Sequence, residues 1–172
     1  IRFIFLFFYC ANVLAEDVYI HHQNYGNTHS KWKNRLEEAG HTVTSSTNTI
    51  TDFSSYEQYY DLRYSGSSLP TDGLKTILSN GGTVFLNGEN TNFTSRNNLI
   101  QSFIRDVTSD NSITYSTSLN IDYSGTNEQL STTSILSTLP SDWAYLNFAF
   151  GGVISNLGTN GKCLAANGQG RC

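Results

Sequence analysis

Residues 81–90 read Gly81-Gly82-Thr83-Val84-Phe85-Leu86-Asn87-Gly88-Glu89-Asn90, and the segment 91–107 follows them. The glycine pair and the later Gly-Glu-Asn run predict turns on either side of a short buried strand. Apolar residues then recur at helical spacing and predict an amphipathic helix; they are Leu99, Ile100, Phe103, Ile104 and Val107. A strand, turn and helix in this order can place one side chain, here the Glu89 carboxylate, at the mouth of an α/β sheet.

The segments around this unit alternate between strand and helix patterns. Strands are predicted at 17–22, 41–46, 59–64 and 112–119, and helices at 29–40 and 69–82. The first helix has Thr28 or Ser30 as a candidate cap and Gly40 as a stop signal. The order strand, helix, strand is typical of a βαβ unit, so an α/β fold class is expected.

Length and composition indicate one domain with a sizeable core. The chain has 172 residues, 38% hydrophobic and only 14% charged, with ten Tyr and ten Phe. Its net charge is −4 and it has no basic run, so nucleic acid is not expected as a partner. A surface rich in Ser, Thr and Asn suits a secreted or cell-surface protein.

The N-terminal segment has the parts of a secretory signal peptide. Arg2 precedes an apolar run, and Val13 and Ala15 occupy the −3 and −1 positions of a cleavage site before Glu16. We therefore expect a signal peptide at 1–15, a single domain at 16–172, and membrane contact only through the secretion signal. The alternatives are a buried first strand or a membrane anchor whose start is missing.

The cysteines are compatible with that compartment. Removal of the signal removes Cys10 and leaves Cys163 and Cys172, which Gly and Asn residues separate, so a small disulfide loop is predicted. Unpaired thiols, or a partner beyond residue 172, are the alternatives. Metal binding by the pair is less expected, because no His lies near it. No cofactor is expected.

The chain resembles the class I glutamine amidotransferase-like fold over roughly residues 17 to 120. The resemblance rests on the segments 32–40, 60–65 and 74–82 and on Val84-Phe85-Leu86-Asn87-Gly88-Glu89-Asn90. It is closest to divergent extracellular relatives with a Gly-Gly-x-Val-Phe-Leu-x-Gly-Glu-Asn run. It implies a flavodoxin-like, three-layer sandwich whose mainly parallel sheet has the order 2-1-3-4 plus later strands. It also implies a last core strand beyond this chain, so the fold would be incomplete at its C-terminus.

The chain differs from that family at the positions of the family's catalytic residues. Amidotransferases carry a nucleophilic Cys at the turn where this sequence has Glu89, or Asn90 if the register slips by one. Their catalytic His follows a late strand, whereas this sequence has no His after His41. The family's catalytic residues therefore cannot be carried over.

In open α/β sheets, ligands bind beyond the carboxyl ends of the strands, where the strand order reverses. That rule predicts a polar and aromatic cleft able to bind hydroxyl-rich ligands. The candidate cleft residues are His21, His22, Asn24, Tyr25, Arg63, Tyr64, Glu89 and Asn90, with Gln23 beside them.

Several of these residues also have structural interpretations. His21 and His22 point to opposite faces of a strand, so one is expected to pack under a helix, and a metal site with Glu89 is the minor alternative. Glu89 is expected to accept backbone N–H bonds at the start of the next helix rather than to act as an acid or base. Arg63 is a candidate partner for Glu89 or Asp61. Asn92-Phe93-Thr94 is a glycosylation sequon beside the cleft.

Three functions remain open from the sequence. The first is a non-catalytic secreted or surface domain for adhesion, or for binding carbohydrate or another extracellular ligand, with a glycan or an extracellular protein as partner. The second is a divergent hydrolase that uses Glu89 as acid or base, with or without His21 or His22 as its partner. The third is a structural module of a larger surface protein. Without a nucleophile, the non-enzymatic function is favoured.

Overall fold

The computed structural model describes residues 14–24, 27–122, 128–129, 131–132, 145–146, 150–163 and 165–166. Most of the predicted signal segment, residues 1–15, lies outside this part of the chain, so the signal peptide stays a prediction. Tyr25 and Cys172 also lie outside it. Within the described residues, no helix is long and apolar enough to cross a membrane.

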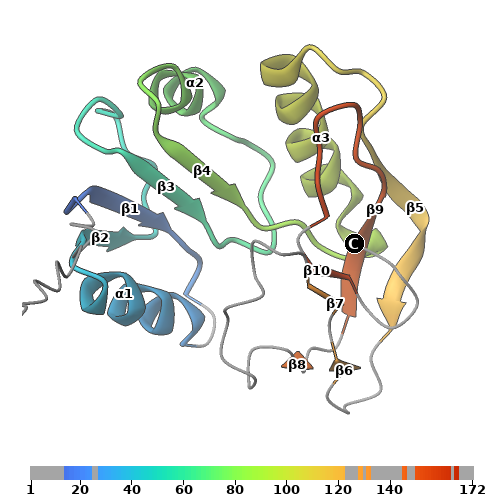
Figure 1. Ribbon diagram of the computed structural model, residues 1–172, viewed down its shortest axis with the longest axis horizontal. Coiled ribbons are helices and arrows are strands. Elements are labelled where there is room, and N and C mark those ends of the chain that lie inside the picture. The colour runs from blue at the N-terminus through green and yellow to red at the C-terminus, as the bar shows by residue number, and fades with distance from the viewer. Residues whose placement is uncertain are drawn as a thin grey trace, which may run out of the picture.

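Four parallel strands form the main sheet, in the order β2-β1-β3-β4 (Figure 1). They are β1 (Asp17–His21), β2 (Thr42–Ser46), β3 (Gln58–Asp61) and β4 (Thr83–Leu86). This arrangement confirms the predicted α/β fold class and the 2-1-3-4 order. The strand order reverses between β1 and β3, so the cleft rule applies at their carboxyl ends.

Helices lie on both faces of this sheet (Figure 1). On one face, Leu36 of α1 (Thr28–Glu38) packs on a cluster made by Val18, Ile20 and Val43. On the other face, α2 (Thr71–Ser79) and α3 (Thr94–Thr108) bury Leu74, Ile77 and Phe103 against two strand tyrosines, Tyr19 and Tyr59. The molecule is therefore the predicted three-layer sandwich, with its largest apolar cluster under α2 and α3.

The helix boundaries agree with most of the local signals in the sequence. Gly40 and Gly81 follow α1 and α2 with φ of 96° and 85°, values that favour glycine. The predicted cap of α1 is wrong, because Asn27 occupies the cap position, and the Asn27 side chain makes no capping hydrogen bond. A short 3-10 helix, η1 (Thr91–Phe93), precedes α3, which the sequence predicted as one continuous helix.

Strand β3 is shorter than predicted for a side-chain reason. The prediction extended it to Tyr64, but it ends at Asp61. The Asp61 carboxylate accepts a hydrogen bond from the backbone N–H of Arg63 at 3.2 Å, and this bond turns the chain away from the strand direction. The residues after Asp61 therefore form the loop that borders the cleft.

The later strands form antiparallel pairs apart from the main sheet. β5 (Thr114–Asp122) pairs with β9 (Phe150–Asn156), and both lie beside α3 (Figure 1). Two shorter pairs join β6 (Glu128–Gln129) to β8 (Tyr145–Leu146) and β7 (Ser131–Thr132) to β10 (Ala165–Ala166). The strand predicted near 112–119 therefore exists, but it does not add to the parallel sheet.

Candidate functional site

A cavity of about 560 Å³ opens at the carboxyl ends of β1, β3 and β4, where the strand order predicts a ligand site. Its volume lies in the range of about 300–1,000 Å³ that is usual for small-molecule sites. The lining residues come from the ends of these strands, the start of α1 and the turn before α3. They are His22, Gln23, Thr28, His29, Leu62, Tyr64, Asn87, Glu89, Asn90 and Phe93.

The structure brings together about half of the predicted cleft residues. His22, Tyr64, Glu89 and Asn90 line the cavity, as does Gln23. His21, Asn24 and Arg63 are not among its lining residues. The remaining candidate, Tyr25, lies outside the described residues.

His21 belongs to the core under α2 and α3. Its Nδ1 lies 2.7 Å from the Tyr59 hydroxyl and its Nε2 lies 3.3 Å from the carbonyl oxygen of Thr47. Burial, assisted by the positive charge of Arg63, lowers the pKa of His21. His21 is therefore a buried structural residue of the sheet, with its ring against strand tyrosines and a loop carbonyl.

His22 faces the opposite side and stacks on His29 from the first turn of α1. The two ring centroids are 3.8 Å apart and the ring planes differ by 4°. Burial and the neighbouring His22 lower the pKa of His29. The lone pairs of imidazole nitrogens lie in the ring planes, so two parallel rings do not direct them at one ion. No group of three or more metal-ligating side chains occurs among the described residues.

Glu89 places a half-buried carboxylate in the cavity wall. Burial raises the pKa of Glu89, while hydrogen bonds from Asn90 and Asn87 and the charge of Arg96 act in the opposite direction. The prediction that Glu89 caps the following helix is wrong in that Asn90 is the capping residue. From the backbone at the start of η1, Glu89 accepts a long 3.4 Å bond from Asn90 N–H, whereas the Asn90 side chain accepts from Asn92 N–H at 2.9 Å and caps η1.

The turn that carries Glu89 is fixed by Asn97, a buried residue of α3. Its Oδ1 accepts from the Glu89 N–H at 2.9 Å, and its Nδ2 donates to the Glu89 carbonyl oxygen at 2.6 Å. The amide side chain thus satisfies both backbone groups of a residue outside regular structure. The Glu89 backbone is held while its carboxylate remains at the cavity.

Gln23 fixes the opposite wall in the same manner. Its Oε1 accepts from the N–H groups of Tyr64 and Ser65 at 3.1 and 3.2 Å, and its Nε2 donates to Ser65 Oγ at 2.8 Å. Tyr64 then meets Phe93 edge to face, with ring centroids 5.9 Å apart. Both loops at the cavity mouth are therefore held by amide side chains, one from the buried Asn97 of α3 and one from the half-buried Gln23, which follows β1.

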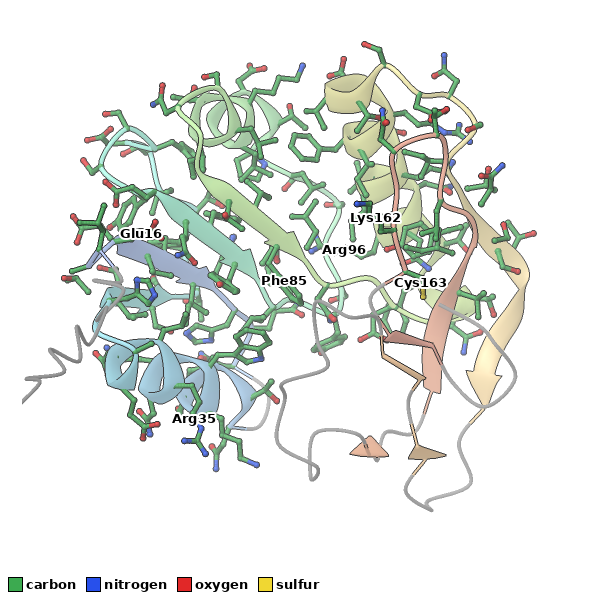
Figure 2. All side chains as sticks on the ribbon, in the orientation of Figure 1. Glu16, Arg35, Phe85, Arg96, Lys162 and Cys163 are labelled. Atoms are coloured by element: carbon green, nitrogen blue, oxygen red, sulfur yellow. The ribbon has the colours of Figure 1, made fainter. Side chains whose placement is uncertain are left out.

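A buried charge cluster lies beneath these loops. Arg63 donates to Asp61 through Nε at 2.9 Å and Nη2 at 2.6 Å, so Asp61 is the partner of Arg63, as one of the two alternatives predicted. Arg96, labelled near the end of β4 in Figure 2, places Nη2 3.1 Å from Asp61 Oδ1, an ion pair outside hydrogen-bond geometry. Burial alone raises the pKa of Asp61, but the two arginines hold it below its ordinary value.

Sequence reasoning missed five lining residues: Thr28, His29, Leu62, Asn87 and Phe93. Two of them were accessible from topology, because the helix after a strand in a βαβ unit begins at the same sheet edge as the cleft. Thr28 and His29 stand at that position. Phe93 lay within the sequon but was not assigned to the cleft.

Two other predicted sites can be placed only in part. Cys163 is disulfide-bonded, but the predicted partner Cys172 lies outside the described residues, so the pairing stays a prediction. Asn92 of the sequon is exposed on η1, next to the lining residue Phe93. A glycan at Asn92 would therefore lie beside the cavity.

Comparison with known proteins identifies no family: no family model, curated protein or solved structure matches the chain. The amidotransferase-like resemblance therefore stays a prediction, and the site is interpreted from its own geometry.

Proposed function

We propose that this is a non-catalytic, secreted or cell-surface domain that binds a carbohydrate or a similar hydroxyl-rich extracellular ligand in the cavity. The single observation that supports this most strongly is the composition of the cavity wall. It combines the Glu89 carboxylate, the amide residues Asn87 and Asn90, and the aromatic side chains of Tyr64 and Phe93. Carboxylates and amides hydrogen-bond to hydroxyl groups, and aromatic rings contact the apolar faces of sugar rings.

The fixed loops support binding rather than a moving catalytic lid. Asn97 and Gln23 hold the backbone on both sides of the cavity, through Glu89 on one side and Tyr64 and Ser65 on the other. A site whose walls are ordered before the ligand arrives loses less conformational entropy when the ligand binds. A small neutral ligand with few groups to anchor it gains most from such order.

The extracellular setting rests on the sequence. The signal-like segment at 1–15 and the low charge content of 14% support secretion, after which a glycan or an extracellular protein is the partner that the protein meets. Adhesion is the role that follows for a surface domain of this kind.

A glycan array probed with the secreted chain tests the proposal. We expect binding by the wild type and loss of binding by Glu89→Gln, which removes the charge but keeps the side-chain volume and the backbone bonds to Asn97. The matched control is Asn98→Ala, an exposed position on α3 beside Asn97. An array without signal for the folded wild type would overturn the carbohydrate proposal.

A second function is favoured by one specific observation. The half-buried Glu89, whose pKa is raised by burial, shares the cavity with His22 and His29. A raised carboxyl pKa and a nearby imidazole suit general acid–base chemistry, so a divergent hydrolase is the alternative. Turnover of ester, amide or glycoside substrates that Glu89→Gln abolishes without unfolding the domain would establish this alternative.

A further inference from the structure

A row of side chains crosses the main sheet on the face that α1 covers. The register pairs Ile20 of β1 with Tyr60 of β3, and Tyr60 with Phe85 of β4. Because neighbouring strands are parallel and in register, these three side chains point to the same face. Ile20 is fully buried, Tyr60 is partly buried and Phe85 is 36% exposed, so the side chains of this row become more exposed to solvent from β1 toward β4.

The helix α1 explains this gradient. Leu36 packs over the β1–β2 half of the face, with Val18, Ile20 and Val43. Trp32 of the same helix reaches the β3–β4 half, where its ring centroid lies 5.3 Å from the ring centroids of both Tyr60 and Phe85. Trp32 is itself 36% exposed, so three aromatic rings meet on a part of the sheet that is open to solvent. We call Trp32, Tyr60 and Phe85 the aromatic triad; Figure 2 labels Phe85 on β4.

The aromatic triad continues directly into the cavity. One pleat further along the strands, the next residues on the same face are His22, Leu62 and Asn87, and all three line the cavity. Backbone hydrogen bonds continue between the strands as far as these residues. Leu62 N–H donates to the His21 carbonyl oxygen and Asn87 N–H donates to the Asp61 carbonyl oxygen, both at 2.9 Å. On α1, the lining residues Thr28 and His29 precede Trp32 by four and three positions, on the same helix side.

We propose that the cavity and the aromatic triad form one continuous site for an oligosaccharide, with the terminal sugar in the cavity and following sugars on the triad. This inference rests on the proposed carbohydrate function and specifies the ligand as a chain rather than a single sugar. Two residues along a strand span roughly 6.6 Å, so the triad lies about that far from the cavity residues of the next row. Adjacent sugar units of one oligosaccharide can bridge this distance.

The shape and polarity of the triad favour an oligosaccharide over a second copy of the protein. Its rings are tilted against one another by 48°, 43° and 26°, and they form a stepped surface instead of a flat one. The Tyr60 hydroxyl donates to Gln58 at 2.8 Å, and Gln58 in turn donates to Glu16, so polar groups border the rings. A stable protein interface buries about 800 Å² per partner, far more than three partly covered rings expose.

The experiment measures affinity against chain length. Wild-type protein is titrated with β-1,4-linked glucose and N-acetylglucosamine oligosaccharides of one to six units, because both apolar ring faces are accessible in such chains. We expect the hexamer to bind about tenfold more tightly than the monosaccharide, a gain in line with one or two added ring contacts. Two variants remove rings: Phe85→Thr introduces a β-branched residue, which a strand tolerates well, and Trp32→Gln introduces a good helix former.

Both variants are expected to bind the monosaccharide as the wild type does and to lose the gain with length. Phe85→Tyr, which keeps a ring, should retain the gain, and Val107→Ala provides a control at an equally exposed apolar residue, 38% exposed on α3. Equal affinity at every length, or a gain that survives both ring deletions, overturns the extended site and leaves the proposed function standing. Absence of binding to any sugar overturns both. A wild-type dimer that Phe85→Thr converts to a monomer shows that the triad is an interface between copies and also overturns the inference.

Discussion

The Asn97 side chain bonds to both backbone polar groups of Glu89: its Oδ1 accepts from the N–H at 2.9 Å, and its Nδ2 donates to the carbonyl oxygen at 2.6 Å. The Asn97 side chain is buried, whereas the Glu89 side chain, which lines the cavity, is half-buried. Position and chemistry are therefore separated, because Asn97 sets where the carboxylate stands and Glu89 supplies its charge. A turn fixed in this way keeps the same geometry with or without a ligand.

Asn97→Ala should loosen this turn. The substitution leaves the backbone groups of Glu89 without partners, which costs about 1–3 kcal/mol when such groups are buried. We expect a loss of that order in the free energy of unfolding, measured with urea, and faster amide hydrogen exchange at Glu89. The neighbouring exposed residue provides the control, since Asn98→Ala should change stability by less than about 0.5 kcal/mol. Unchanged exchange at Glu89 in Asn97→Ala would contradict the proposed hold.

Asp61→Asn should destabilise the protein far more strongly. Asp61 is fully buried and is the carboxylate to which both Arg63 and Arg96 pair, and Arg96 is 1% exposed. Removing the negative charge leaves two guanidinium groups buried without it, a change that typically costs about 3–5 kcal/mol. Chemical denaturation measures this cost, and Asp72→Asn at an exposed position of α2 is the matched control.

The same residue predicts part of the acid sensitivity. Because the folded state lowers the pKa of Asp61, its contribution is complete above the unfolded value of about 3.9 and is lost as pH falls through the folded value. The wild type should therefore lose stability below about pH 4 more steeply than Asp61→Asn does. Parallel curves for the two proteins would show that Asp61 does not carry a net stabilising charge.

His21 predicts a second pH effect, in a higher window. Burial lowers the pKa of His21, so between its folded value and the ordinary value of 6.5 the unfolded chain binds the extra proton. Stability should therefore rise with pH through this window and level off above about pH 6.5. His21→Phe, which keeps an aromatic ring beside Tyr59, should flatten the dependence of the unfolding free energy on pH. A slope that is unchanged in His21→Phe would assign the effect to another group.

The sequence predicted the parallel sheet well because its signals are local. Turn glycines such as Gly40 and Gly81 and short β-branched strands recur in order along the chain, and each can be recognised within a few residues. The placement of β5 was beyond such signals, because its partner residues in β9 lie about 30 to 40 positions later and pairing of distant strands leaves no local trace. Strand 112–119 was recognised as a strand, but its antiparallel partner was not, for that reason.

The candidate site was predictable in position and less so in detail. The strand order fixed the cleft at the ends of β1 and β3, and His22, Tyr64 and Glu89 were found there. Arg63 was placed in the cleft because it stands at the carboxyl end of the predicted third strand, yet the side chain turns back to Asp61 two residues earlier. Whether a charged side chain faces solvent or a buried partner depends on tertiary contacts. The roles of Asn97 and Gln23 were invisible for the same reason.

Ligand binding should depend on pH through Glu89. Burial raises the pKa of Glu89 above its ordinary value of 4.5, so this carboxylate gains its proton at a higher pH than an exposed one. If the charged form accepts hydrogen bonds from ligand hydroxyls, affinity should fall on acidification with a midpoint above pH 4.5, while Glu89→Gln binds weakly at every pH. Isothermal titration between pH 4 and 8 measures the midpoint, and circular dichroism at each pH confirms that the protein stays folded. His29→Gln separates the imidazoles from the carboxylate, because it removes one ring of the stacked pair and leaves Glu89 unchanged. A midpoint that disappears in His29→Gln would assign the pH dependence to the histidines and contradict the role given to Glu89.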